Sequence, residues 1–66
     1  MKNYRGKEVK LVCSSTGVEM SVGSEVVSFR GERSVITSMN PPHKSSASGY
    51  VNNYYAGVYN LEFVEL

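Results

Sequence analysis

The feature that most constrains this chain is the repeated alternation of short β-forming runs with turn-forming clusters. Val, Ile, Thr, Tyr and Phe together supply 20 of the 66 residues, whereas Ala and Leu are scarce. β-Branched and aromatic side chains suit a pleated, half-buried surface, and no window carries the i, i+3, i+4, i+7 apolar stripe of an amphipathic helix. The sequence therefore predicts an almost entirely β structure.

The first half of the chain has the pattern of two β-hairpins. Residues 8–14 and residues 18–22 alternate between apolar and polar side chains on either side of a turn that contains Gly17. Residues 25–29 and residues 34–39 then flank a charged turn. Two alternating runs around a short Gly-containing loop are typical of a hairpin, so we expect four strands here.

The second half is expected to add one or two strands around longer loops. Residues 40–49 include two consecutive prolines and three serines, which predicts a polar loop because proline cannot donate to a strand ladder. Residues 50–53 predict a fifth strand, and residues 53–57 a bend. Residues 58–64 predict the last strand, with Tyr59 facing the core.

Five or six short strands in one domain, residues 1–66, need a way to protect their edges. A chain of this size buries only a thin core, and closing the sheet removes exposed strand edges. We therefore predict an all-β fold, a small SH3-like barrel of five to six short antiparallel strands. An OB-like barrel and an open antiparallel meander that dimerises through an edge are the alternatives.

A resemblance supports the barrel. Residues 22–32, Val-Gly-Ser-Glu-Val-Val-Ser-Phe-Arg-Gly-Glu, resemble the opening of SH3-like modules, including KOW-type domains, where a Gly-polar pair leads into a strand that ends at another Gly. With residues 41–42, 48–51 and 54–63, the layout looks like that of small uncharacterised bacteriophage proteins. The chain lacks the basic loop pattern of KOW domains. The resemblance implies a phage accessory protein that acts on a host component, and it transfers no catalytic residues.

Charge and cysteine content narrow the function classes. Seven Lys and Arg against six Glu leave a net charge of +1, without the basic excess of a dedicated nucleic-acid-binding protein. No apolar run has the length of a membrane span, and no apolar stretch follows the basic N-terminal residues as in a secretory signal. One cysteine forms no intramolecular disulfide. We expect a cytoplasmic protein, in the bacterial host if it is phage-encoded, with no cofactor or metal.

Residues for catalysis are sparse. His43, the only histidine, lies in the Pro-rich loop beside Lys44 and is expected to be a solvated loop residue. Cys13 is in phase with Val9 and Leu11, which predicts a small buried core residue rather than a nucleophile. There is no Asp, no cluster of acids, and no phosphate-binding or nucleophile motif. The chain is therefore predicted not to be an enzyme.

Tyrosines supply the most informative functional pattern. Four of the five lie within ten residues and alternate with Asn and Gly, a composition that resembles binding loops. The adjacent Tyr54 and Tyr55 would point to opposite faces of an extended segment, so at most one can lie in the core. The sequence predicts a non-enzymatic protein-interaction module whose partner is a host or phage protein. The residues predicted to contact it are Tyr50, Asn53, Tyr54, Tyr55, Arg30, Arg33, His43 and Lys44.

Two other functions follow from the same residues. Nucleic acid could be bound by basic side chains with tyrosine stacking, and the residues concerned are Lys2, Arg5, Lys7, Arg30, Arg33 and Lys44. A homodimer could form by edge pairing across a two-fold axis. The near-neutral charge and the thin core favour the homodimer, whereas a net charge of only +1 weighs against nucleic-acid binding.

Overall fold

Eight short strands and a single 3₁₀ turn make up the computed structural model, which describes residues 1–66. The elements in order are β1 (Val9–Cys13), β2 (Glu19–Met20), β3 (Glu25–Val27), β4 (Arg33–Val35), β5 (Met39–Asn40), β6 (Tyr50–Val51), β7 (Tyr54–Tyr55), η1 (Ala56–Tyr59) and β8 (Leu61–Glu65). They form three small antiparallel sheets, with the orders β2-β1-β8, β3-β4 and β5-β6-β7. The predicted β structure is confirmed, but there are eight strands rather than five or six, and no sheet is closed.

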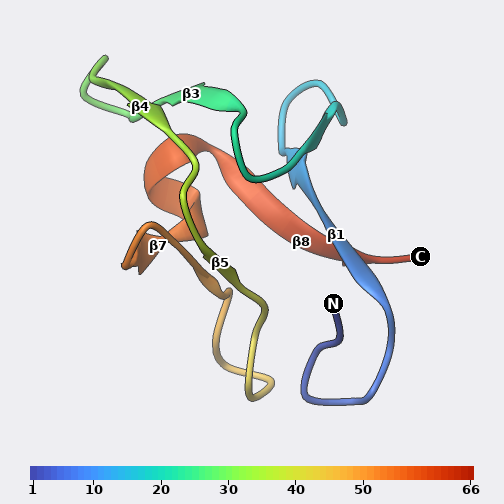
Figure 1. The fold of residues 1–66 in the computed structure, drawn as a ribbon. Coiled ribbons are helices and arrows are strands. Elements are labelled where there is room, and N and C mark those ends of the chain that lie inside the picture. The colour runs from blue at the N-terminus through green and yellow to red at the C-terminus, as the bar shows by residue number, and fades with distance from the viewer.

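The longest strand pair joins the two ends of the described chain. β1 and β8 pair along their full lengths, from Val9 opposite Glu65 to Cys13 opposite Leu61, and Figure 1 shows the blue β1 beside the red β8. On its other edge β1 pairs with β2, where Leu11 lies opposite Met20. The first predicted hairpin is therefore confirmed, with a shorter second strand than expected.

The second hairpin is also confirmed, but its second strand is interrupted. β3 and β4 pair with Glu25 opposite Val35, around the charged turn of residues 28–32. The predicted continuous strand over residues 34–39 is wrong, because β4 ends at Val35 and β5 begins at Met39. The backbone between them turns from one sheet to the next. Ile36 still bonds to the backbone of Gly23 and Ser24, whereas the N–H groups of Thr37 and Ser38 donate to the side chain of Asn52.

The tyrosine-rich segment forms a hairpin and a 3₁₀ turn rather than a simple bend. Asn52 and Asn53 both have positive φ, 52° and 69°, which is the backbone of a two-residue hairpin turn between β6 and β7. η1 follows and ends at Asn60, whose φ is 57°. The predicted strand start at residue 58 is therefore wrong. β8 begins at Leu61 because η1 occupies the preceding residues.

One small core connects the three sheets. Leu11, Ile36 and Val51 are fully buried, and each comes from a different part of the chain. Tyr59 is buried with them at 8% exposure, as expected, although it comes from η1 and not from a strand. Fully burying one such aliphatic side chain contributes about 1.5–3 kcal/mol, so this cluster is the main support for the surrounding turns.

Cys13 lies at the edge of this core rather than inside it. Its side chain packs against the core cluster but is only half-buried, so the expectation of a buried core residue is wrong. β1 ends at this residue and the next residues form a turn. The thiol therefore faces hydroxyl groups, with Sγ 3.3 Å from Ser15 Oγ.

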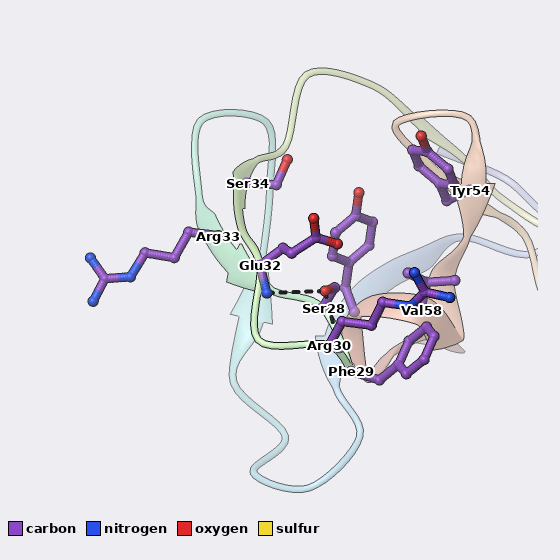
Figure 2. Close-up of a pocket in the computed structure, with 9 residues that line it drawn as sticks. Ser28, Phe29, Arg30, Glu32, Arg33, Ser34, Tyr54 and Val58 are labelled. Atoms are coloured by element: carbon purple, nitrogen blue, oxygen red, sulfur yellow. Dashed lines mark hydrogen bonds between the residues drawn. The ribbon is translucent and has the colours of Figure 1, made fainter.

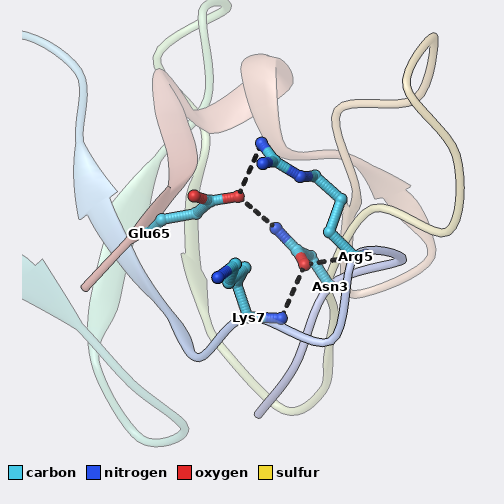
Figure 3. Close-up of polar contacts among 4 residues, drawn as sticks. All are labelled: Asn3, Arg5, Lys7 and Glu65. Carbon is cyan, nitrogen blue, oxygen red and sulfur yellow. Dashed lines mark hydrogen bonds and ion pairs between the residues drawn. The ribbon is translucent and has the colours of Figure 1, made fainter.

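The N-terminal loop, residues 3–7, is held to β8 by side-chain contacts (Figure 3). Asn3 Oδ1 accepts hydrogen bonds from the backbone N–H groups of Arg5 and Lys7, at 3.0 and 3.1 Å. Asn3 Nδ2 donates to Glu65 Oε2 at 3.0 Å, and Arg5 Nη1 lies 3.4 Å from the same oxygen. Tyr4 N also donates to Pro42 O at 3.0 Å. The loop is thereby fixed against both β8 and the Pro-rich loop.

Candidate functional site

An open cavity of about 540 Å³ lies between the charged turn of residues 28–32 and the segment formed by β7 and η1 (Figure 2). We name it the Phe29 cavity. Its lining residues are Ser28, Phe29, Arg30, Glu32, Arg33, Ser34, Tyr54, Val58 and Tyr59. The two walls are distant in sequence, so the cavity exists only in the folded chain.

Ser28 organises the turn that forms one wall. Its side chain is buried, and Oγ accepts hydrogen bonds from the backbone N–H groups of Arg30 and Glu32, each at 3.2 Å. Ser28 N also donates to Glu32 O at 2.8 Å. A small hydroxyl at this position satisfies two backbone donors of the turn at once. The turn is therefore ordered even though most of its side chains face solvent.

A backbone hydrogen bond joins the two walls. Phe29 N donates to Val58 O at 2.8 Å, which fixes the turn against η1. The Phe29 ring itself is 66% exposed, and the Arg30 guanidinium carbon lies 5.6 Å from the ring centroid. An exposed aromatic ring on a backbone that is already held in place suits a binding surface, because the backbone entropy of that residue is not lost again on binding.

Tyr54 forms the aromatic part of the opposite wall. Its ring is 59% exposed and packs edge to face against Tyr59, with the centroids 6.4 Å apart and an interplanar angle of 80°. Since Tyr59 is in the core, this contact orients Tyr54 toward the cavity rather than leaving it free in solvent.

The charge at the Phe29 cavity is positive. Arg30 and Arg33 line it together with one acid, Glu32. None of these three makes an ion pair, since the ion pairs of the structure are Met1 with Glu8 and Arg5 with Glu65. In Figure 2 the Arg30 side chain lies over Phe29, and the Arg33 side chain extends away from Phe29 and Tyr54. The Arg30 guanidinium is therefore the one placed to meet a carboxylate of a ligand that contacts Phe29.

The structure brings three of the predicted partner-binding residues together at this cavity. Arg30 and Arg33 come from the charged turn and Tyr54 comes from β7. Tyr54 and Tyr55 are both exposed, so neither is a core residue.

The other predicted residues lie elsewhere. A second cavity, of about 510 Å³, which we name the Tyr50 cavity, is lined by Lys2, Asn3, Tyr4, Asn40, Pro41, Pro42, His43 and Tyr50. Tyr55 stacks on Tyr50, with ring centroids 5.1 Å apart and an interplanar angle of 25°. Lys44 and Asn53 are exposed and line neither cavity.

The basic residues considered for nucleic-acid binding are also divided. Lys2 lines the Tyr50 cavity, whereas Arg30 and Arg33 line the Phe29 cavity. Arg5 is paired with Glu65. The structure therefore gives no single cavity that contains all of these cations.

Sequence reasoning missed Phe29, Val58 and Ser28. Phe29 was expected at the end of a strand, but β3 ends at Val27 and leaves the ring on the turn. A usable signal was present, because an aromatic residue directly before Arg-Gly-Glu-Arg belongs with the turn as readily as with the strand. Val58 has no comparable signal, since its role depends on the backbone contact with Phe29.

Two titratable groups are perturbed outside the Phe29 cavity. The hydroxyl of Ser15 and then that of Thr16 lower the pKa of Cys13 from 9.0 to about 6. A hydrogen bond with Tyr55, together with the Tyr55 charge, raises the pKa of Tyr50 above its usual value, so Tyr50 keeps its proton. No group of three or more His, Cys, Asp or Glu side chains is placed to hold a metal ion.

No helix of the structure has the length and apolar character needed to cross a membrane. Comparison with protein-family models, curated proteins and solved structures finds no match to this chain.

Proposed function

We propose that this protein is a non-enzymatic protein-interaction module that binds its partner at the Phe29 cavity. The observation that carries the proposal is the convergence of Phe29, Arg30 and Tyr54 from two fixed segments of the chain. Aromatic and Arg side chains are the residues that most often dominate binding energy at protein interfaces.

The cavity favours a particular kind of partner segment. The exposed Phe29 and Tyr54 rings offer apolar contact on both walls. Arg30 and Arg33 outnumber the single acid and lack ion-pair partners. The complementary ligand is a protein segment that presents an apolar side chain flanked by a carboxylate. The resemblance to small phage proteins points to a host protein of the bacterial cytoplasm as its source.

We also propose that the three sheets correspond to an SH3-like barrel that is not fully hydrogen-bonded. Closure of a barrel requires the first and last strands to meet, and β1 pairs with β8. All three sheets contribute to one core, as the wall of a small barrel would. The gaps between the sheets lie where turns and side-chain contacts replace the strand ladder.

The test compares two neighbouring tyrosines. Tyr54→Ala and Tyr55→Ala each remove one exposed ring and one aromatic contact, but only Tyr54 lines the Phe29 cavity. The tagged proteins are used to capture partners from nuclease-treated bacterial lysate, and the retained proteins are quantified by mass spectrometry. We expect one dominant protein, reduced about tenfold or more by Tyr54→Ala and retained by Tyr55→Ala.

A second variant, Phe29→Ala, is expected to reduce capture as Tyr54→Ala does, because Phe29 also lines the cavity. The variant should fold, because the exposed ring adds little to the core. Circular dichroism of each variant checks the fold. Equal loss of the captured protein in Tyr54→Ala and Tyr55→Ala, or capture unaffected by Phe29→Ala, would show that the Phe29 cavity is not the binding surface.

The homodimer remains a separate prediction. β3 and β4 pair only with each other, so each keeps one strand edge without a ladder partner. Edge pairing between two copies would use such an edge. Sedimentation velocity at high micromolar concentration measures the oligomeric state, and a monomer at that concentration rules the dimer out.

A further inference from the structure

The Tyr50 cavity is a second site, separate from the Phe29 cavity, with which it shares no lining residue. It lies between the N-terminal loop and the Pro-rich loop, which are joined by the hydrogen bond from Tyr4 N to Pro42 O at 3.0 Å. The N-terminal loop is in turn held to Glu65 by Asn3 and Arg5 (Figure 3). Both walls are therefore fixed before any ligand arrives.

The charge of the Tyr50 cavity favours an anion. No Asp or Glu lines it, whereas Lys2 brings a positive charge and His43 brings an imidazole N–H. Lys2 has no ion-pair partner, and the nearby carboxylate of Glu65 is already bound by Asn3 and Arg5. An ammonium group and an imidazole N–H can both donate hydrogen bonds to phosphate oxygens.

The aromatic surface of the cavity favours a ligand that also carries a flat ring. Tyr50 is half-buried in β6 and is stacked on Tyr55, so its ring is held in one orientation. Stacking of a base on an aromatic side chain contributes about 1–3 kcal/mol and tolerates any base. The volume of about 510 Å³ is within the range of small-ligand sites.

We propose that the Tyr50 cavity binds a nucleotide, with the phosphate at Lys2 and His43 and the base against Tyr50. The cavity offers, side by side, hydrogen-bond donors for a phosphate and an aromatic ring for a base. The source is either a single-stranded nucleic acid or a free nucleotide. This site goes beyond the proposed protein-binding function and uses none of its residues.

The experiment is an NMR titration of the ¹⁵N-labelled protein at low salt with three probes. These are an eight-residue oligothymidine, thymidine monophosphate and an eight-residue poly-Glu peptide. We expect the oligothymidine to shift the amide signals of Lys2, Tyr4, His43 and Tyr50 and to leave those of Phe29 and Val58 unchanged. If thymidine monophosphate binds with the same dissociation constant as the oligothymidine, the natural ligand is a free nucleotide. If the oligothymidine binds more tightly, the natural ligand is a single-stranded nucleic acid.

Matched charge variants separate a site from general attraction. Lys2→Gln and Lys7→Gln change the net charge equally, but only Lys2 lines the cavity. We expect Lys2→Gln to weaken oligothymidine binding several-fold more than Lys7→Gln and to reduce the slope of log affinity against log salt by about 0.7. Both residues are exposed, so both variants should fold.

Three results would overturn the proposal. The first is an equal effect of Lys2→Gln and Lys7→Gln, which would indicate diffuse charge attraction. The second is binding of poly-Glu as tight as that of oligothymidine, which would indicate an acidic peptide site. The third is the absence of shifts at the Tyr50 cavity with either nucleotide probe. None of these results bears on the Phe29 cavity, so failure of the nucleotide proposal would leave the protein-binding proposal unaffected.

Discussion

Asn52 binds the backbone and the side chain of Thr37 through one oxygen atom. Asn52 Oδ1 accepts hydrogen bonds from Thr37 N at 2.7 Å and from Thr37 Oγ1 at 2.9 Å, and its Nδ2 donates to Val35 O at 2.8 Å. The amide thereby replaces a strand partner for the N–H groups of Thr37 and Ser38. This replacement lets the chain pass from the β3–β4 sheet to the β5–β6–β7 sheet.

Asn52→Ala should destabilise the protein by about 2–4 kcal/mol, because several backbone groups lose a hydrogen-bond partner. Asn53→Ala is the matched control. Asn53 also has positive φ, 69° against 52°, but its side chain makes no hydrogen bond in the structure. Urea unfolding of both variants measures the difference. Equal losses in the free energy of unfolding would mean that the positive φ, and not the Asn52 amide, accounts for the destabilisation.

Gly49→Ala should prevent stable folding or cost about 3 kcal/mol or more. Gly49 is buried with φ +87°, and an added Cβ would lie 2.5 Å from Phe63 Cε2 and 2.8 Å from Asn40 O. Gly57→Ala is the control, since Gly57 has no positive φ and a Cβ there meets nothing within 4 Å. Thermal unfolding should show Gly57→Ala unchanged or slightly more stable. A mild effect of Gly49→Ala would contradict the close packing of Phe63 on this glycine.

Ser28→Ala should loosen the charged turn more than it destabilises the whole protein. The Ser28 hydroxyl accepts from the N–H groups of Arg30 and Glu32, and losing these bonds should cost about 1–2 kcal/mol. Amide hydrogen exchange measured by NMR should show faster exchange at those two residues. The core amides of Leu11 and Val51 serve as the internal reference. Uniformly faster exchange across the chain would show that Ser28 supports the fold and not the turn alone.

Cys13 should react as a thiolate at lower pH than an ordinary cysteine. Its pKa is lowered to about 6, first by the Ser15 hydroxyl, so the rate of alkylation by iodoacetamide should reach half its maximum near pH 6. Ser15→Ala should move this midpoint upward. Because the folded pKa lies below the unfolded one, the folded state holds fewer protons, and stability should rise between about pH 6 and pH 9. A midpoint near 9 in the folded protein would contradict the hydroxyl contacts.

The hairpins of the first half were predictable because their signals are local. Alternation over β1, the turn at Gly17 and the charged turn after β3 depend on neighbouring residues alone. The division of the predicted strand over residues 34–39 was not predictable in the same way. It depends on Asn52, a residue that is distant in sequence. The side chain of Asn52 binds this segment, and its backbone has a positive φ that few residues tolerate.

The candidate site was predictable in its residue types but not in its geometry. Arg30, Arg33 and Tyr54 were selected because such side chains are common at interfaces, without any information on their distance. Their convergence depends on the hydrogen bond between Phe29 N and Val58 O, and a contact between backbone atoms has no residue-type signature. For the same reason Tyr50 and His43 were grouped with these residues although they line the other cavity.

The pairing of β1 with β8 has a consequence for synthesis of the chain. Until residues 61–65 have emerged from the ribosome, β1 has only the two-residue β2 as a partner. Contacts between distant parts of a chain slow folding, and a strand that has not yet paired is prone to aggregate. We therefore expect folding to follow translation of β8 as one late step. A nascent chain that stalls at Asn60 should be a substrate for chaperones and proteases rather than a partly folded protein.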